Sequence, residues 1–321
     1  MKINRDFNVT TTRRRFLAGA GSLAAAAFLL SSIGQAQSEN RTRIILLGTK
    51  GGPSVGTSGR SNSATVVLIN GVPYLVDCGY GVSRQLIAAG ISLDRLRYIF
   101  ITHHHSDHNL EYGPLLYNAA VASAASRIDA YGPPGLQKMT QDFYRYEQFD
   151  IETRLKDEGG SDFRKLIFVH DFARPGLVMR NADVKVTSFR VRHPPITQSY
   201  AYRFDAKDRS VVISGDTAYA PGLADFAKGA DELIHEAMYL PGIQKLIERY
   251  PDAKRLGQHL MASHTSTEDV GRVAAQAGVK TLVLSHLVPG DDPSITDDQW
   301  AEGARKHFSG RIIVGKDLME I

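Results

Sequence analysis

The stretch that most constrains this chain is "ITHHHSDHNL", which directly follows the apolar segment "LRYIF". It holds four histidines and one aspartate, namely His103, His104, His105, His108 and Asp107. Side chains at positions i and i+2 of an extended segment point the same way, so His103 and His105 can share one metal ion. Asp107 and His108 follow the turn and can reach a second ion, whereas His104 faces the opposite side and is not expected to be a direct ligand. Any fold for this chain must therefore bring further ligands to the end of this strand.

Polar residues also stand at the ends of other apolar segments. "SFRVR" ends at His193, "VVISG" at Asp216 and "VLS" at His286. A catalytic zinc ion takes about three protein ligands, and two ions roughly 3.5–4 Å apart can share a hydroxide and a bridging carboxylate. We expect Asp216 to bridge the two ions, His193 to complete the first site and His286 the second. Three other histidines lack motif support and are assigned no role: His170, His259 and His307.

The order of the predicted elements indicates the fold class. In the first half, strands such as "RIILLGT" and "ATVVLIN" precede helices such as "GLQKMTQDFYRYEQF". In the second half, "DVKVTSFRVRH" and "SYAYRFDA" precede the helices "TSTEDVGRVAAQAG" and "TDDQWAEGARKHF". Strands followed by helices in each half predict an α/β protein, a four-layer αββα sandwich in which residues 37–321 form a single domain.

The N-terminal residues 1–36 have the pattern of an export signal rather than of a folded element. Three arginines precede an apolar stretch that is shorter than the roughly 20 residues of a membrane span. Gly34 and Ala36 then suit a cleavage site. The order Thr-Arg-Arg-x-Phe-Leu resembles a twin-arginine signal, and a plain Sec signal is the alternative. We therefore expect a periplasmic or secreted protein that meets the membrane only during export.

Charge and cysteine content narrow the expected partners. Residues 1–36 carry a net charge of +4 and the whole chain is also +4, so the remainder is formally neutral. Proteins that bind polyanions usually carry bulk positive charge, so nucleic acid is not an expected partner. Cys78 is the single cysteine, which excludes an intramolecular disulfide. The sequence leaves a homodimer as one possible assembly.

Together the motifs resemble those of the metallo-β-lactamase superfamily. "LVDCGYG", "THHHSDHN", His193, "SGDT" and "SHL" follow one another in the order of that family, from about residue 43 to residue 315. The resemblance implies the αββα fold and two divalent metal ions, with zinc expected. It implies His103, His105 and His193 as ligands of one ion. Asp107, His108 and His286 would hold the other, and Asp216 would bridge the two.

Within that superfamily the chain looks most like the branch of RNase Z and the zinc arylsulfatases. "ELIHEA" and "SHTSTEDVGRVAAQAG" resemble the His-Glu-Ala-Thr and His-Ser-Thr blocks of that branch. The resemblance implies that His264 contacts the charged oxygen or leaving group of the substrate and that Glu236 orients it. His235 is expected to have a supporting or structural role. Methionine replaces the usual threonine after the alanine of the first block.

The branch leaves the substrate open. Members that process tRNA carry a protruding arm between the residues matching His193 and Asp216, and here only 23 positions separate them. We therefore expect a small anionic ester, first a sulfate ester, then a small phosphodiester, then a lactone. A metal-activated hydroxide would attack it, Asp107 would orient the hydroxide, and His264 would stabilise or protonate the leaving group.

Two other interpretations compete with a hydrolase. Diiron redox members of this fold have glutamate at the position of His105, and this chain has no flavin-binding appendage, which argues against that class. Non-catalytic members tend to lose ligands, whereas the seven expected ligands are all present here. Both interpretations are therefore weaker than a dinuclear hydrolase.

Overall fold

The computed structural model describes residues 41–56, 58–122 and 126–321. The predicted export signal, residues 1–36, lies outside the described residues. Residues Thr42–Ile321 form one compact unit. In the described part of the chain, no helix has the length and apolar character needed to cross a membrane.

The described strands form two seven-stranded sheets. The first has the order β14-β1-β2-β3-β4-β5-β6. Its strands are β1 (Arg43–Gly48), β2 (Ala64–Ile69), β3 (Val72–Val76), β4 (Tyr98–Phe100), β5 (Ile128–Gly132), β6 (Ile167–Asp171) and β14 (Met319–Glu320). Pairing is antiparallel from β14 to β3 and parallel from β3 to β6.

The second sheet has the order β13-β12-β11-β10-β9-β8-β7. Its strands are β7 (Gly176–Arg180), β8 (Val184–Arg190), β9 (Tyr200–Ala206), β10 (Ser210–Ile213), β11 (Glu232–Met238), β12 (Thr281–Val288) and β13 (Arg311–Val314). Pairing is antiparallel from β7 to β10 and parallel from β10 to β13. Each sheet thus has an antiparallel part and a parallel part.

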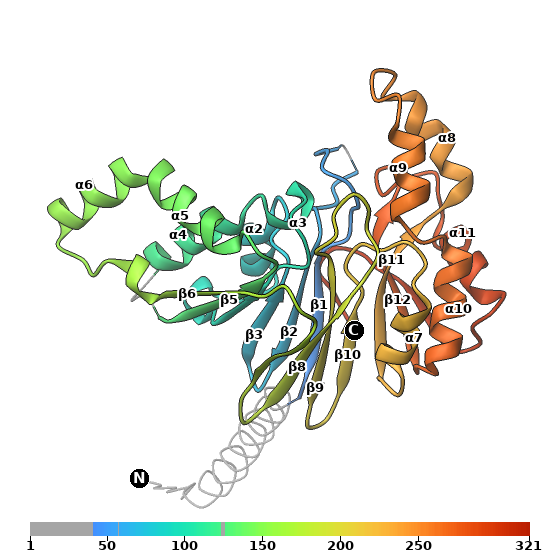
Figure 1. The fold of residues 1–321 in the computed structure, drawn as a ribbon, viewed down its shortest axis with the longest axis horizontal. Helices are drawn as coiled ribbons and strands as arrows, with labels where there is room; N and C mark the ends of the chain where they lie inside the picture. The colour runs from blue at the N-terminus through green and yellow to red at the C-terminus, as the bar shows by residue number, and fades with distance from the viewer. Residues whose placement is uncertain (1–40, 57, 123–125) are drawn as a thin grey trace, which may run out of the picture. The chain divides into compact units, whose positions relative to one another are not determined.

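Helices cover the outer face of each sheet (Figure 1). Against the first sheet lie α2 (Val82–Ala88), α4 (Tyr112–Ala122) and α5 (Leu136–Tyr146), and α6 (Gln148–Glu158) follows α5. Against the second lie α7 (Pro221–Ala227), α10 (Thr267–Ala277) and α11 (Asp297–Arg305). Three further helices are α3 (Ser106–Asn109), α8 (Leu240–Glu248) and α9 (Leu256–Ser263), and the 3₁₀ turns are η1 (Leu93–Arg95) and η2 (Phe163–Leu166).

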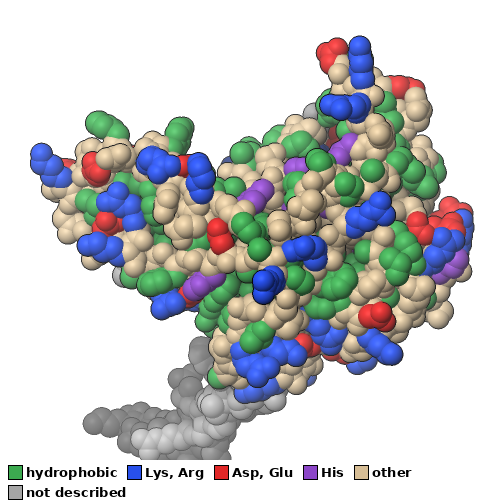
Figure 2. Space-filling model, in the orientation of Figure 1, with side chains coloured by type: hydrophobic (Ala, Val, Ile, Leu, Met, Phe, Trp, Pro, Cys, Tyr) green, Lys and Arg blue, Asp and Glu red, His purple; other side chains and the backbone are tan. Residues whose placement is uncertain are grey.

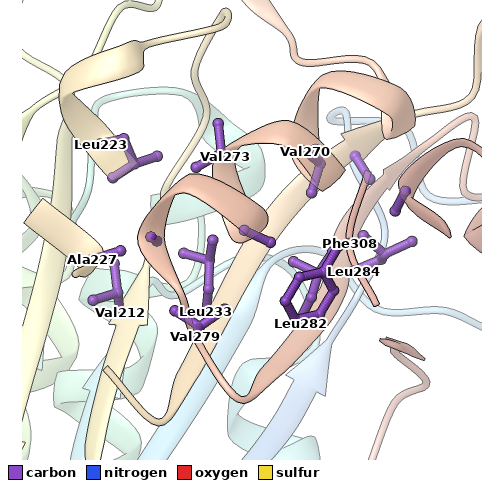
Figure 3. Close-up of a cluster of buried hydrophobic side chains, with 14 of the residues drawn as sticks. Val212, Leu223, Ala227, Leu233, Val270, Val273, Val279, Leu282, Leu284 and Phe308 are labelled. Atoms are coloured by element: carbon purple, nitrogen blue, oxygen red, sulfur yellow. The ribbon is translucent and has the colours of Figure 1, made fainter. Parts of the chain in front are cut away.

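Alternation along the strands separates the core into layers, because successive side chains of a strand point to opposite faces. In β1, Ile44 and Leu46 join the cluster between the two sheets, whereas Ile45 and Leu47 join the cluster beneath the helices of the first sheet. A third cluster lies between the second sheet and α7, α10 and α11, where Leu282 and Leu284 of β12 meet Phe308 (Figure 3). These layers confirm the predicted αββα sandwich.

The segment between β11 and α10 differs from the sequence prediction, which assigns it no element. It forms α8 and α9, which pack against each other and project from the rest of the second half (Figure 1). Apolar residues Ile243 and Leu260 of this hairpin pack with Met238 and Val288 at the ends of β11 and β12. A helical hairpin with its own small apolar cluster thus stands beside the strand ends.

Candidate metal centre and substrate cavity

The first group of donor atoms comes from the end of β4 and from the turns after β8 and β10. It consists of His103, His105, His193 and Asp216, whose ligand atoms all lie within 4.8 Å of one another. The Nδ1 atom of His105 lies 3.1 Å from Nε2 of His103 and 3.0 Å from Nε2 of His193. Three imidazole nitrogens that converge in this way can bind one cation.

The second group consists of Asp107, His108, Asp216 and His286, again within 4.8 Å. Nε2 of His286 lies 3.2 Å from Oδ2 of Asp107 and 3.2 Å from Oδ2 of Asp216. Nε2 of His108 lies 3.2 Å from Oδ1 of Asp216. Asp216 therefore belongs to both groups, and the fold brings together all seven residues that the sequence singles out as ligands.

Hydrogen bonds at the back of the histidine rings leave the nitrogens that face the site available to a metal ion. Nδ1 of His108 donates to Oδ2 of Asp77 at 2.7 Å, and Nδ1 of His193 donates to the carbonyl of Ser263 at 2.9 Å. Since these acceptors hold a proton on Nδ1, Nε2 is the nitrogen of each ring that faces the site, and a cation bound there would replace any proton on it. Within the described residues, buried atoms without a hydrogen-bond partner include Nε2 of His108 and Oδ1 of Asp216, both of which face the site.

Burial keeps the imidazoles of the first group neutral. It lowers the pKa of His103 and of His193, and it lowers the pKa of His105 to about 4. A neutral imidazole is the form that binds a metal. These three side chains are therefore ready to act as ligands at neutral pH.

Negative charge dominates the second group. Burial would raise the pKa of Asp216, but the positive charges of His108 and His286 outweigh it and lower this pKa. Burial would also lower the pKa of His108, but three carboxylates outweigh it and raise that pKa: Asp216, Asp77 and Asp107. Carboxylates packed this closely favour a cation between them.

Asp77 is a site residue that the sequence analysis misses. It follows β3 with a φ of 63°, and it accepts from the backbone N–H of Thr102 at 2.8 Å and from the Thr102 hydroxyl at 2.9 Å. Its carboxylate also accepts the hydrogen bond from Nδ1 of His108. The aspartate of "LVDCG" at the end of an apolar strand is the signal that could have identified it, because a buried carboxylate needs charged or hydrogen-bonding partners.

His286 reaches the site through an irregularity in β12. The register between β11 and β12 shifts after Glu236 and Ser285, so His286 is the extra residue of a β-bulge, with a φ of 44°. Gly51 passes close to it. A Cβ atom at Gly51 would lie 2.8 Å from the His286 ring and 2.6 Å from Val288. The position of His286 thus depends on a bulge and on a residue without a side chain.

His264 and Glu236 form a pair beside the second donor group. Nδ1 of His264 lies 3.1 Å from Oε2 of Glu236, whose Oε1 accepts from the backbone N–H groups of Thr217 and Thr265. Burial would lower the pKa of His264, but the charge and hydrogen bond of Glu236 outweigh it and raise the pKa to about 9. The His264 ring stacks on that of His286, with centroids 5.7 Å apart. A cationic donor is therefore held next to the metal-binding groups.

The other histidines have different surroundings. His104 contacts the carbonyl of Pro133 and the side chain of Asn109. His235 is buried, with Nδ1 2.7 Å from the carbonyl of Glu236. His170 pairs with Asp129 and His307 with Glu268. His259, to which the sequence assigns no role, lies on α9 with its ring centroid 6.1 Å from that of His105 and 6.0 Å from that of His193.

A cavity of about 360 Å³ lies over the donor groups. Side chains of both groups, with His264, line it: His105, Asp107, Asp216, His264 and His286. Residues 50–54 and the α8–α9 hairpin contribute its walls. Histidine side chains reach the surface between α3 and this hairpin (Figure 2). The metal-binding groups are therefore open to a molecule of limited size.

This arrangement has counterparts in known proteins. A family model described as the metallo-beta-lactamase superfamily matches residues 57–286. The chain belongs to the metallo-beta-lactamase superfamily. It is a metal-dependent hydrolase that acts on ester bonds, as the sequence predicts.

Curated relatives agree with this assignment, and solved structures share the fold. Ribonuclease Z of Mycobacterium marinum is 30% identical over 281 residues, which cover 87% of this chain and 97% of that protein. Ribonuclease Z of Mycobacterium bovis BCG is 31% identical over 287 residues, with the same coverage. The metallo-beta-lactamase fold protein YhfI of Bacillus subtilis superposes with a TM-score of 0.64 at 22% identity, covering 88% of this chain and 99% of that one. Human short-form tRNase Z gives a TM-score of 0.61 at 23% identity, covering 87% and 98%.

The relatives correct the predicted order of substrates. The sequence places a sulfate ester first, but relatives named Ribonuclease Z favour the phosphodiester alternative. The sequence analysis does not expect nucleic acid as a partner, and relatives named Ribonuclease Z do not support that expectation. Between His193 and Asp216, the structure has only a turn and the β9–β10 hairpin, so a protruding arm is absent from this described interval.

Proposed function

We propose that this member of the superfamily is a phosphodiesterase that uses two divalent ions, most simply zinc. The observation that carries the proposal is the pair of donor groups that share Asp216, in a chain whose relatives are ribonucleases. His103, His105 and His193 would hold one ion. Asp107, His108 and His286 would hold the other, and Asp216 would contact both. When bound, such a pair of ions supplies a water molecule of lowered pKa and positive charge for the developing anion.

The residues of the chain would contribute binding, orientation and proton transfer. Hydrolysis adds water to phosphorus and breaks one P–O ester bond, and the departing oxygen takes up a proton. His264, protonated through its pairing with Glu236, stands where it can give that proton or a hydrogen bond. The backbone N–H of Gly52 donates to Oδ2 of Asp107 at 2.9 Å, so this carboxylate is fixed in orientation while it binds the metal or accepts a proton from water.

The test is a substrate panel on zinc-loaded protein. Bis(p-nitrophenyl) phosphate should be hydrolysed faster than p-nitrophenyl sulfate or an aryl lactone, and EDTA should abolish the reaction. Asp216→Ala and His103→Ala should remove activity, whereas His307→Ala, a substitution of an exposed histidine that pairs with Glu268 and belongs to neither donor group, should leave it unchanged. Faster hydrolysis of the sulfate ester, or full turnover in metal-free protein, would contradict the proposal.

Export by the twin-arginine pathway is a second part of the proposal, and it rests on residues 1–36 alone. Cell fractionation should find the protein in the periplasm or medium with its N-terminus near residue 37. Replacing Arg13 and Arg14 by lysine should leave it in the cytoplasm. Unchanged export of that variant would point to the Sec pathway.

A further inference from the structure

Apart from the donor groups, the cavity is walled mainly by apolar side chains. The α8–α9 hairpin supplies Leu246, Tyr250, Ala253, Leu256 and Leu260, and the segment after β12 supplies Pro289. The volume of about 360 Å³ falls in the range of small-molecule sites. Since a space of roughly 150 Å³ accommodates benzene, this cavity can hold an aromatic ring beside a phosphate group.

Apart from His264 beside the donor groups, the walls of the cavity offer few groups that could bind an anion. Lys50 is the one lysine or arginine among the described residues that line the cavity. Its Nζ donates to the carbonyls of Gly51 and Gly52 at 3.2 and 3.1 Å and to Oγ of Ser54 at 3.1 Å. An ammonium has three donors, so all of them are already used. Asp291, which also lines the cavity, is paired with Arg249, so this ion pair provides no uncompensated positive charge.

The hairpin is held in place as a wall. Arg249 at the end of α8 forms two hydrogen bonds with Asp291, at 2.8 and 2.9 Å. Lys245 pairs with Asp292 at 2.8 Å. Both aspartates belong to the segment that follows β12, the strand that carries His286. The apolar wall is therefore tied to the same strand as one of the proposed ligands.

We propose that this wall binds an uncharged, aryl-sized ester group, so that the substrate is a small phosphodiester bearing such a group rather than a polynucleotide. The inference rests on the proposed function, which places the phosphorus at the donor groups. A polynucleotide would bring further phosphates and sugar hydroxyls against apolar side chains, and burial of unpaired polar groups is costly. An aryl group would instead remove apolar surface from water on both sides.

Equilibrium binding tests the inference with a readout other than the rate of hydrolysis. Calorimetry on zinc-loaded protein compares three probes: dimethyl phosphate, diphenyl phosphate and a single-stranded RNA dodecamer. Diphenyl phosphate should bind at least tenfold more tightly than dimethyl phosphate, and the RNA should bind more weakly than diphenyl phosphate. Tyr250→Ala should weaken diphenyl phosphate about tenfold, the effect of losing roughly 50 Å² of apolar contact, and should not change dimethyl phosphate.

Tyr146→Ala is the matched control, because Tyr146 is an exposed tyrosine on α5 and does not line the cavity. It should change neither affinity. Leu256→Gln is a second variant of the wall, to be used if Tyr250→Ala does not fold, and it should also weaken only diphenyl phosphate. Equal binding of the two diesters, tighter binding of the RNA, or wall variants with unchanged affinity would overturn the inference.

Failure of the proposed function gives a different result. If no phosphodiester is cleaved but diphenyl phosphate still binds through Tyr250, the aryl site stands and the phosphodiesterase does not. If bis(p-nitrophenyl) phosphate is cleaved but the aryl preference is absent, only the inference about the substrate fails.

Discussion

Replacement of Asp216 by alanine should remove the stabilisation that zinc confers on this protein. Asp216 is buried and its carboxylate contacts members of both donor groups, His108 and His286 at 3.2 Å among them. Two groups of donor atoms contain Asp216. His193 belongs to the first of them only, and His286 belongs to the second only. Loss of Asp216 should therefore affect both ions, and loss of either histidine should affect one.

The size of the effect follows from ligand linkage. An ion present at a thousandfold its Kd stabilises the folded state by about 4 kcal/mol. The compact unit Thr42–Ile321 has an unfolding entropy of roughly 0.6 kcal/mol per kelvin, at about 2.1 cal/mol/K per residue. Each ion should thus raise the Tm by about 7 °C, and two ions by about 14 °C.

Differential scanning calorimetry with zinc and with EDTA measures this difference within each variant, so that intrinsic effects of the substitution cancel. Elemental analysis counts the bound ions. The native chain should show the full shift, His193→Ala and His286→Ala about half with one ion each, and Asp216→Ala almost none. A full zinc shift in Asp216→Ala would refute the shared carboxylate, and loss of both ions in His193→Ala would refute the division into two groups.

Three further outcomes are expected. In EDTA-treated protein, Glu236→Gln should cost about 3 kcal/mol below pH 6.5. That difference should disappear as pH rises through about 9. The pKa of His264 is raised from its ordinary 6.5 to about 9, and the pair stabilises the fold only while His264 is protonated. Urea unfolding across pH measures the difference, and a difference that grows with pH would contradict the prediction. Asp77→Asn should lower zinc affinity about 10- to 100-fold, because the hydrogen bond that orients the proposed ligand His108 is weakened. Competition with a chromogenic chelator measures the affinity, and an unchanged affinity would exclude Asp77 from this role. Gly51→Ala should cost about 1–3 kcal/mol in urea unfolding and displace His286, whereas Gly160→Ala, where a Cβ meets nothing, should be neutral; equal effects would show that the close contact does not matter.

The proposed metal ligands could be predicted from the sequence because the patterns that mark them are local. His103 and His105 share a face by the period of an extended chain, and His193 and Asp216 follow apolar strands directly. The fold class follows from the order of the elements, since strands followed by helices in each half predict two sheets that are covered by helices. Other parts of the site do not follow from such patterns. Asp77 matters because β3 and β4 are neighbours, and His286 reaches the site through a bulge that only the pairing with β11 reveals.

The sequence by itself determined the layered fold, the metal-binding residue types and the absence of an arm between His193 and Asp216. Tertiary structure decided which donors meet, how Glu236 charges His264, and where α8 and α9 stand. The reason is physical: side-chain periodicity is encoded over a few neighbouring residues, whereas distances, burial and pKa values depend on partners far apart in the chain. The apolar wall of the cavity belongs to the second kind, because it exists only where the hairpin packs beside β12.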